Sequence, residues 1–125
     1  MITKVLYANG SSCLLFGALF LALPGGVAGF LGSPPQWLIV VLGAGLILNG
    51  LHLLWAARRG AGRMELLHFT VGDGAWVAGT LLLVASGLWI TTTPGILAAL
   101  ACAVPVGTFG VLQARAAARI QASAD

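Results

Sequence analysis

The stretch from Trp37 to Ala57, WLIVVLGAGLILNGLHLLWAA, decides the fold of this chain. It contains no charged residue, and a helix of this length, rising about 1.5 Å per residue, crosses the roughly 30 Å hydrocarbon core of a bilayer. Two prolines, Pro34 and Pro35, precede it, and the pair Arg58-Arg59 follows it. Because lipid offers the backbone no hydrogen-bond partner, such a run must be helical. The stretch therefore predicts a transmembrane helix.

Three further runs of the same kind lie along the chain. They cover residues 5–23, 66–90 and 96–114, and a short polar helical tail follows at 115–125. The loop at residues 24–36 is rich in Gly and Pro, and a short turn of helix is expected at 27–31. The sequence thus predicts one membrane domain spanning residues 1–125, an all-α, antiparallel four-helix transmembrane bundle.

Composition excludes an ordinary water-soluble domain. Hydrophobic residues make up 59% of the chain and charged residues only 7%, whereas a soluble domain carries roughly 25% charged residues. The net charge of +3 does not indicate a nucleic-acid partner, because the basic residues lie at the ends of apolar runs and form no face. The expected surroundings are the lipid bilayer and other membrane proteins.

The basic residues also predict the orientation of the chain. All six Lys and Arg residues fall on the side shared by both termini and the 58–63 loop, while the loops at 24–36 and 91–95 carry no charge. Cytoplasmic loops of membrane proteins carry an excess of Lys and Arg. We therefore expect a multi-pass protein of the plasma (inner) membrane with both termini cytoplasmic.

A few polar side chains lie within the predicted spans, on the cytoplasmic half. Counted from Arg58 and Arg63, His52 and His68 lie roughly 8–9 Å deep, and Asn49 and Asp73 roughly 14–15 Å deep. Asn9 occupies a similarly shallow level on the first span. Gln113 is placed closer to the surface, because it precedes Arg115 by only two residues.

Asp73 is the least favourable of these residues to place inside a membrane. A carboxylate near the bilayer centre costs about 2.5–3.5 kcal/mol on insertion scales, and such residues are candidates for function. It either carries a proton or accepts hydrogen bonds from Asn49, His52 or Asn9. Trp76 lies nearby, away from the membrane interface. The expected interface or buried polar residues are Asp73, Trp76, Asn49, Asn9 and Gln113.

Helical spacing divides the third predicted span into two faces. One face carries His68, Gly72, Ala75 and Gly79, which are small residues above a single histidine. The other carries Glu65, Phe69, Asp73, Trp76 and Thr80. We expect Glu65, two residues after Arg63, to pair with an arginine.

Three functions are compatible with this pattern. The first is an accessory or interaction subunit, which packs against copies of itself as a homo-oligomer or joins a larger membrane complex. The second is a redox-linked protein binding haem b through His52 and His68. The third is a small transporter or proton-linked channel that uses Asp73 with the two histidines.

Enzyme chemistry has the least support in the sequence. No Ser, His and Asp stand at a plausible catalytic spacing, and no metal site beyond the two histidines can be assembled. Gly72 and Gly74 resemble part of a nucleotide loop, but they lie inside a membrane span. We therefore expect no catalytic residues.

Overall fold

The computed structural model describes residues 2–124, and every regular element in that range is a helix. Four helices are long and apolar enough to cross a membrane, which indicates a membrane protein. A short fifth helix, α2, links the first two. The bounds are α1 Ile2–Ala22, α2 Pro24–Leu31, α3 Gln36–Arg59, α4 Arg63–Ser86 and α5 Thr93–Ala124.

The bounds of all four long helices differ by a few residues from the predicted spans, and the largest differences lie at the ends of the last two helices. The third long helix ends at Ser86 instead of Ile90, because Gly87 adopts a left-handed conformation with φ 69° that stops the helix. The last helix runs without interruption to Ala124, so the polar tail continues the span. The expected short helix in the first loop is present and begins earlier, at Pro24.

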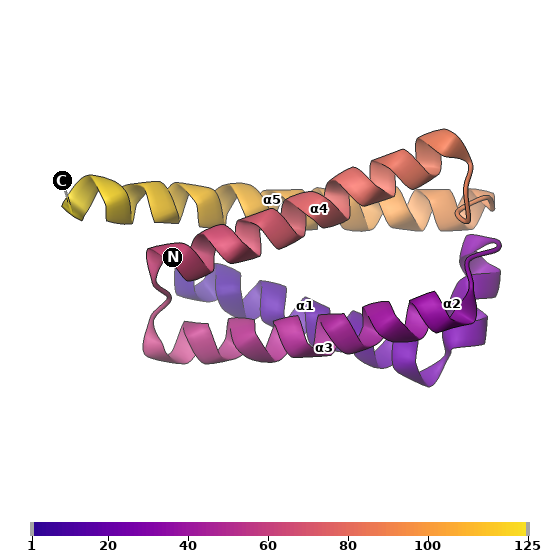
Figure 1. Ribbon diagram of the computed structural model, residues 1–125, viewed down its shortest axis with the longest axis horizontal. Coiled ribbons are helices and arrows are strands. Elements are labelled where there is room, and N and C mark those ends of the chain that lie inside the picture. Colours follow the sequence, from indigo (N-terminus) through magenta and orange to yellow (C-terminus); the bar gives the residue numbers. More distant parts are fainter. Residues whose placement is uncertain (1, 125) are drawn as a thin grey trace.

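The long helices pack as two pairs. Helix α1 lies mainly against α3, and α4 lies mainly against α5, as Figure 1 shows. The pairs meet chiefly where α1 contacts α5. Helices α3 and α4 follow one another in the chain but separate beyond the turn that joins them. A contact between α1 and α5 is therefore what holds the two pairs together.

Glycines set the spacing of the α1–α3 pair. A Cβ on Gly17 would lie 2.9 Å from the carbonyl oxygen of Gly43, and a Cβ on Gly50 would lie 2.9 Å from that of Gly10. At both positions the backbones are already in contact, so a larger residue would push the helices apart. Small residues at such positions are the usual means of close helix packing in membranes.

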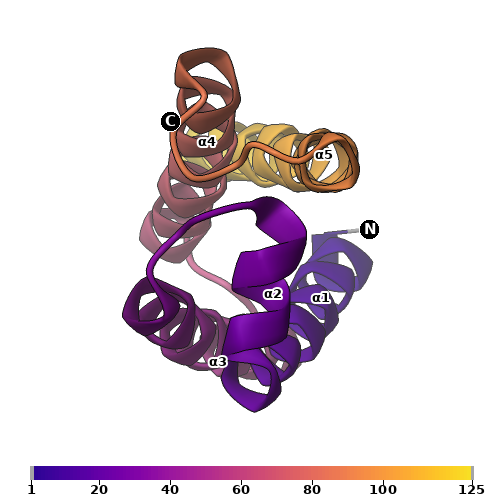
Figure 2. The same cartoon turned by 90° about the vertical axis from the view of Figure 1, so that its right-hand side faces the viewer.

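The two ends of the molecule differ in charge. The start of α1, the α3–α4 turn and the end of α5 lie at one end (Figure 1), and this end carries all the lysine and arginine residues. At the other end, Thr91 N–H donates to Leu31 O at 2.9 Å and Ser33 N–H donates to Trp89 O at 3.0 Å. Figure 2, which looks onto this end, shows α2 in front of the α1–α3 pair.

The hydrophobic core lies toward the charged end, where all four long helices contribute to it. Leu53 of α3 is fully buried, and Leu6, Leu66, Phe69 and Ala117 are at most 2% exposed. Most other large apolar side chains along the long helices, among them Leu15, Leu48, Val71, Leu82 and Val104, face outward. An apolar outer surface of this kind is what contact with lipid requires.

The glycine contacts predict how single substitutions affect stability. Gly43→Ala should lower the free energy of unfolding by about 1–3 kcal/mol, because the added Cβ would lie 2.9 Å from Phe20 Cβ and overpacking costs that much. Gly45→Ala, two residues along the same helix, meets nothing within 4 Å and should leave stability unchanged or raised. Unfolding of the purified protein in detergent measures both. Equal stability of the two variants would contradict the close α1–α3 contact.

Candidate functional site

The candidate site is built around Asp73 on the inward face of α4. Asp73 is only 6% exposed, and Phe69 and Thr80 on the same face are also buried. Gly110 of α5 lies opposite, where a Cβ would approach Asp73 Cβ at 3.4 Å. The hydroxyl of Thr70 donates to the carbonyl oxygen of Gly110 at 3.4 Å. The small residue on α5 thus lets the two helices approach at the level of the carboxyl group.

Two amide side chains satisfy the Asp73 carboxyl. Asn9 Nδ2 of α1 donates to Asp73 Oδ2 at 3.0 Å, and Gln113 Nε2 of α5 donates to the same oxygen at 2.8 Å. Asn9 Nδ2 also donates to Gln113 Oε1 at 3.0 Å. Asn9 is 2% exposed and Gln113 is fully buried. The three side chains form a closed triangle of hydrogen bonds, which we call the Asn9–Asp73–Gln113 network.

This network joins the two helix pairs. Asn9 belongs to the α1–α3 pair, while Asp73 and Gln113 belong to the α4–α5 pair. Interhelical hydrogen bonds in membranes are worth about 0.6 kcal/mol on average. Leaving a buried polar group without its partner costs more, about 1–3 kcal/mol. The network therefore adds little to overall stability. Its larger effect is to disfavour helix arrangements in which one of these side chains lacks its partner.

The polar contacts continue from the network to α3 through a cysteine. Cys13 Sγ donates to Asn9 Oδ1 at 3.7 Å, and Asn49 Nδ2 of α3 donates to Cys13 Sγ at 3.6 Å. A chain of polar contacts thus runs through all four long helices. The sequence alone predicts no role for Cys13, although its place one helical turn after Asn9 is a signal for a contact between the two side chains.

The predicted buried polar residues are largely gathered at this site. Asn9, Asp73 and Gln113 are in direct contact, and Asn49 joins them through Cys13. Of the three expected donors to Asp73, the structure shows Asn9. Among the described residues, the second donor is Gln113, and neither Asn49 nor His52 bonds to Asp73. Trp76 is half-buried one turn along α4 and takes no part in the network.

The two histidines belong to a separate cluster at the α3–α4 turn. His52 Nε2 lies 2.9 Å from Glu65 Oε2, and Arg59 forms an ion pair with the same carboxylate. The other carboxylate oxygen of Glu65 accepts the Gly62 N–H at 3.2 Å, which caps the start of α4. The expected pairing of Glu65 with an arginine is confirmed. Glu65 thus links the end of α3 to the start of α4 across the turn.

His52 and His68 lie side by side, with ring centroids 5.9 Å apart. Phe69 packs against both rings, at 4.8 Å from His52 and 5.8 Å from His68. His68 is exposed on the outer face of α4. Within residues 2–124 no group of three His, Cys, Asp or Glu side chains is placed to hold a metal ion. Binding of haem b by the two histidines stays a prediction.

Comparison of the chain with models of protein families, with characterised proteins and with solved structures finds no match. The function must therefore be argued from the geometry of the chain itself.

The network predicts the effect of removing one of its members. Gln113→Leu has nearly the same size but leaves Asp73 with one donor, so it should lower the free energy of unfolding by about 1–3 kcal/mol. Thr108→Val is the matched control on α5, because that exposed hydroxyl bonds only to the Val104 carbonyl of its own helix. It should change stability by less than about 0.5 kcal/mol. Unfolding in detergent micelles measures both, and equal effects would refute the network.

Proposed function

We propose that this chain is an interaction protein of the plasma (inner) membrane. It crosses the bilayer four times as an antiparallel bundle, keeps both ends on the cytoplasmic side, and associates with a second copy of itself through α4. The orientation is supported by the location of every Lys and Arg at one end of the molecule, since cytoplasmic loops carry the excess of such residues.

The single observation that carries the association is the outward face of α4. His68, Gly72, Ala75 and Gly79 lie on this face, and a Cβ added at Gly72 or Gly79 would meet nothing within 4 Å. The glycines of α1 and α3 that pair inside the chain are at contact distance, as described above. Glycines therefore occur in two settings in this chain. The paired glycines of α1 and α3 pack against each other, whereas Gly72 and Gly79 of α4 have no such neighbour.

The spacing of the open glycines matches that of the paired ones. Gly72 and Gly79 are seven positions apart, as are Gly10 and Gly17 on α1 and Gly43 and Gly50 on α3. Each glycine in a helix costs about 1 kcal/mol relative to alanine. Within one chain, Gly72 and Gly79 make no helix–helix contact that would offset this cost. A second helix packed on this face of α4 would make such a contact.

His68 supports the same conclusion. It is an exposed polar side chain on the same face of α4 and near the charged end. A polar ring turned toward lipid is unfavourable, whereas membrane helices commonly bury such groups against one another. Protein contact on this face would cover both the histidine and the open glycines.

A second copy of the chain is the occupant we favour. The α1–α3 pair already packs one pair of glycines, seven positions apart, against another in antiparallel order. Two copies of α4 in the same membrane orientation would bring their glycine pairs together in parallel order. The face also presents no carboxylate or arginine that would select a partner of opposite charge. Self-association about a two-fold axis is the commonest form of oligomer.

The network around Asp73 supports a scaffold more than a transport site. Its carboxyl group is occupied by two donors from the same chain, and His52 bonds to Glu65 and not to Asp73. A proton relay through these three residues would need contacts that the described residues do not make. Haem binding and proton-linked transport stay alternative predictions, and no specific observation favours either.

Self-association through α4 can be tested by energy transfer between labelled copies in liposomes. The double variant Gly72→Leu, Gly79→Leu fills the open face, so it should weaken association at least tenfold in the protein-to-lipid ratio at half-maximal transfer. The matched control is Gly74→Leu. This glycine also has open space around it but lies on a different face of α4, so its association should equal that of the unaltered chain.

Three outcomes would overturn the proposal. The first is a lack of transfer with the unaltered chain at any density, and the second is equal transfer by the double variant. The third is an equal loss in the control, because it would indicate a general effect of larger side chains on α4. Extraction of the unaltered chain from membranes by carbonate would separately contradict the membrane location.

A further inference from the structure

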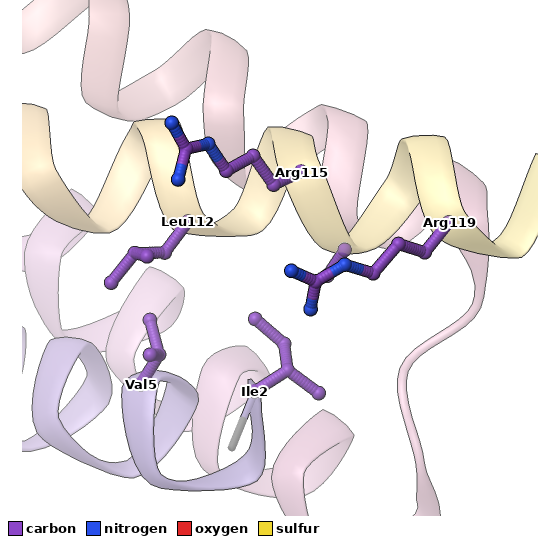
Figure 3. A pocket seen from close by; sticks show the side chains of 6 residues that line it. Ile2, Val5, Leu112, Arg115 and Arg119 are labelled. Carbon is purple, nitrogen blue, oxygen red and sulfur yellow. The ribbon is translucent and has the colours of Figure 1, made fainter.

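A small crevice lies between the start of α1 and the last part of α5, at the charged end. Ile2 and Val5 line it from α1, and Leu112 and Ala116 line it from α5. Two arginines of α5, Arg115 and Arg119, complete its wall, and Figure 3 shows these side chains. The volume is about 40 Å³, so the crevice admits a small group and not a whole ligand.

The two arginines come from successive turns of α5. They are four positions apart and therefore share one face of the helix. In Figure 3 the Arg119 guanidinium group lies on the side of Ile2, whereas the Arg115 guanidinium group lies over the α5 ribbon above Leu112. Both side chains are exposed, and each offers a planar set of donors that suits the oxygens of a phosphate group.

Within residues 2–124 neither arginine has an acidic partner. The two carboxylates described there are Glu65, which binds Arg59 and His52, and Asp73, which is buried in its network. Lys4, Arg58 and Arg63 add positive charge to the same end of the molecule. An anion at this crevice would therefore meet no competing carboxylate from residues 2–124.

A shallow apolar groove continues from the crevice along α5. It has a volume of about 470 Å³ and shares Leu112 with the crevice. Its lining belongs to α5, extends from Leu112 to Ala103 and includes Gly107. Nine helical residues span roughly 14 Å, which is close to the roughly 15 Å thickness of one leaflet's hydrocarbon.

We propose that the crevice and groove bind one anionic phospholipid of the cytoplasmic leaflet. Its phosphate group lies between Arg115 and Arg119, and one acyl chain follows the groove toward Ala103. The hydroxyl of Thr108 bonds to its own helix, so the groove presents an apolar surface. Basic pockets between membrane helices on the cytoplasmic side bind such headgroups. The site rests on the proposed membrane orientation and does not depend on self-association through α4.

Native mass spectrometry of the delipidated, full-length protein in detergent tests the site. The probes are phosphatidylglycerol and phosphatidylcholine with identical acyl chains. The unaltered chain should bind the anionic lipid about tenfold more tightly or better, because each basic residue near a membrane surface contributes attraction for anionic lipid. The double variant Arg115→Gln, Arg119→Gln should lose this preference.

The matched control is the double variant Lys4→Gln, Arg58→Gln. It removes the same charge from the same end without altering a residue of the crevice, so it should keep the preference. Thr108→Trp fills the groove and should weaken binding of both lipids severalfold. Circular dichroism confirms that each variant remains helical before binding is compared.

Several results would overturn the site. Equal preference in the arginine variant and the unaltered chain would exclude the two arginines, and an equal loss in the control would indicate attraction by net charge alone. Displacement of the lipid by millimolar inorganic phosphate would indicate a site for free phosphate. All of these measurements are made in detergent, whereas the membrane location is tested by carbonate extraction. Failure of the lipid site and failure of the proposed membrane location are therefore distinguishable.

Discussion

Lipid provides no hydrogen-bond partners, so polar groups inside a membrane must bond to one another. In this chain the Asn9–Asp73–Gln113 network meets that requirement. Asp73 is 6% exposed, and its carboxyl group accepts hydrogen bonds from side chains of two other helices. Helix pairs held by glycine contacts alone could slide or separate, because such contacts lack direction. The network instead fixes α1 against α4 and α5 at one level, and the core around Leu53 forms beside it.

The paired glycines of α1 and α3 and those of α4 have different surroundings. Where two glycine-bearing faces meet, as at Gly17 and Gly43, the backbones touch and the pair is defined. Where a glycine face remains open, as at Gly72 and Gly79, the chain retains the surface on which we propose that another helix packs. The polar network and the paired glycines together account for the fold, and the open face accounts for the proposed association.

Much of this arrangement could be predicted from the sequence, because span length and charge placement depend only on local composition. The partners of Asp73 were harder to predict. The sequence pattern includes Asn9 among the expected donors, but it places Gln113 near the surface, because the predicted span ends just before Arg115. Helix α5 continues to Ala124, so that arginine marks no helix end. The role of Cys13 depends on how α1 faces α3, which periodicity alone does not determine.

Solid-state NMR of the labelled protein in lipid bilayers can detect the Asn9–Asp73–Gln113 network. We expect through-space cross-peaks from the Asp73 carboxyl carbon to the side-chain amides of both Asn9 and Gln113. These amide protons should also exchange slowly with D₂O, because the network is buried. Absence of both cross-peaks, with rapid exchange of the amide protons, would refute the network.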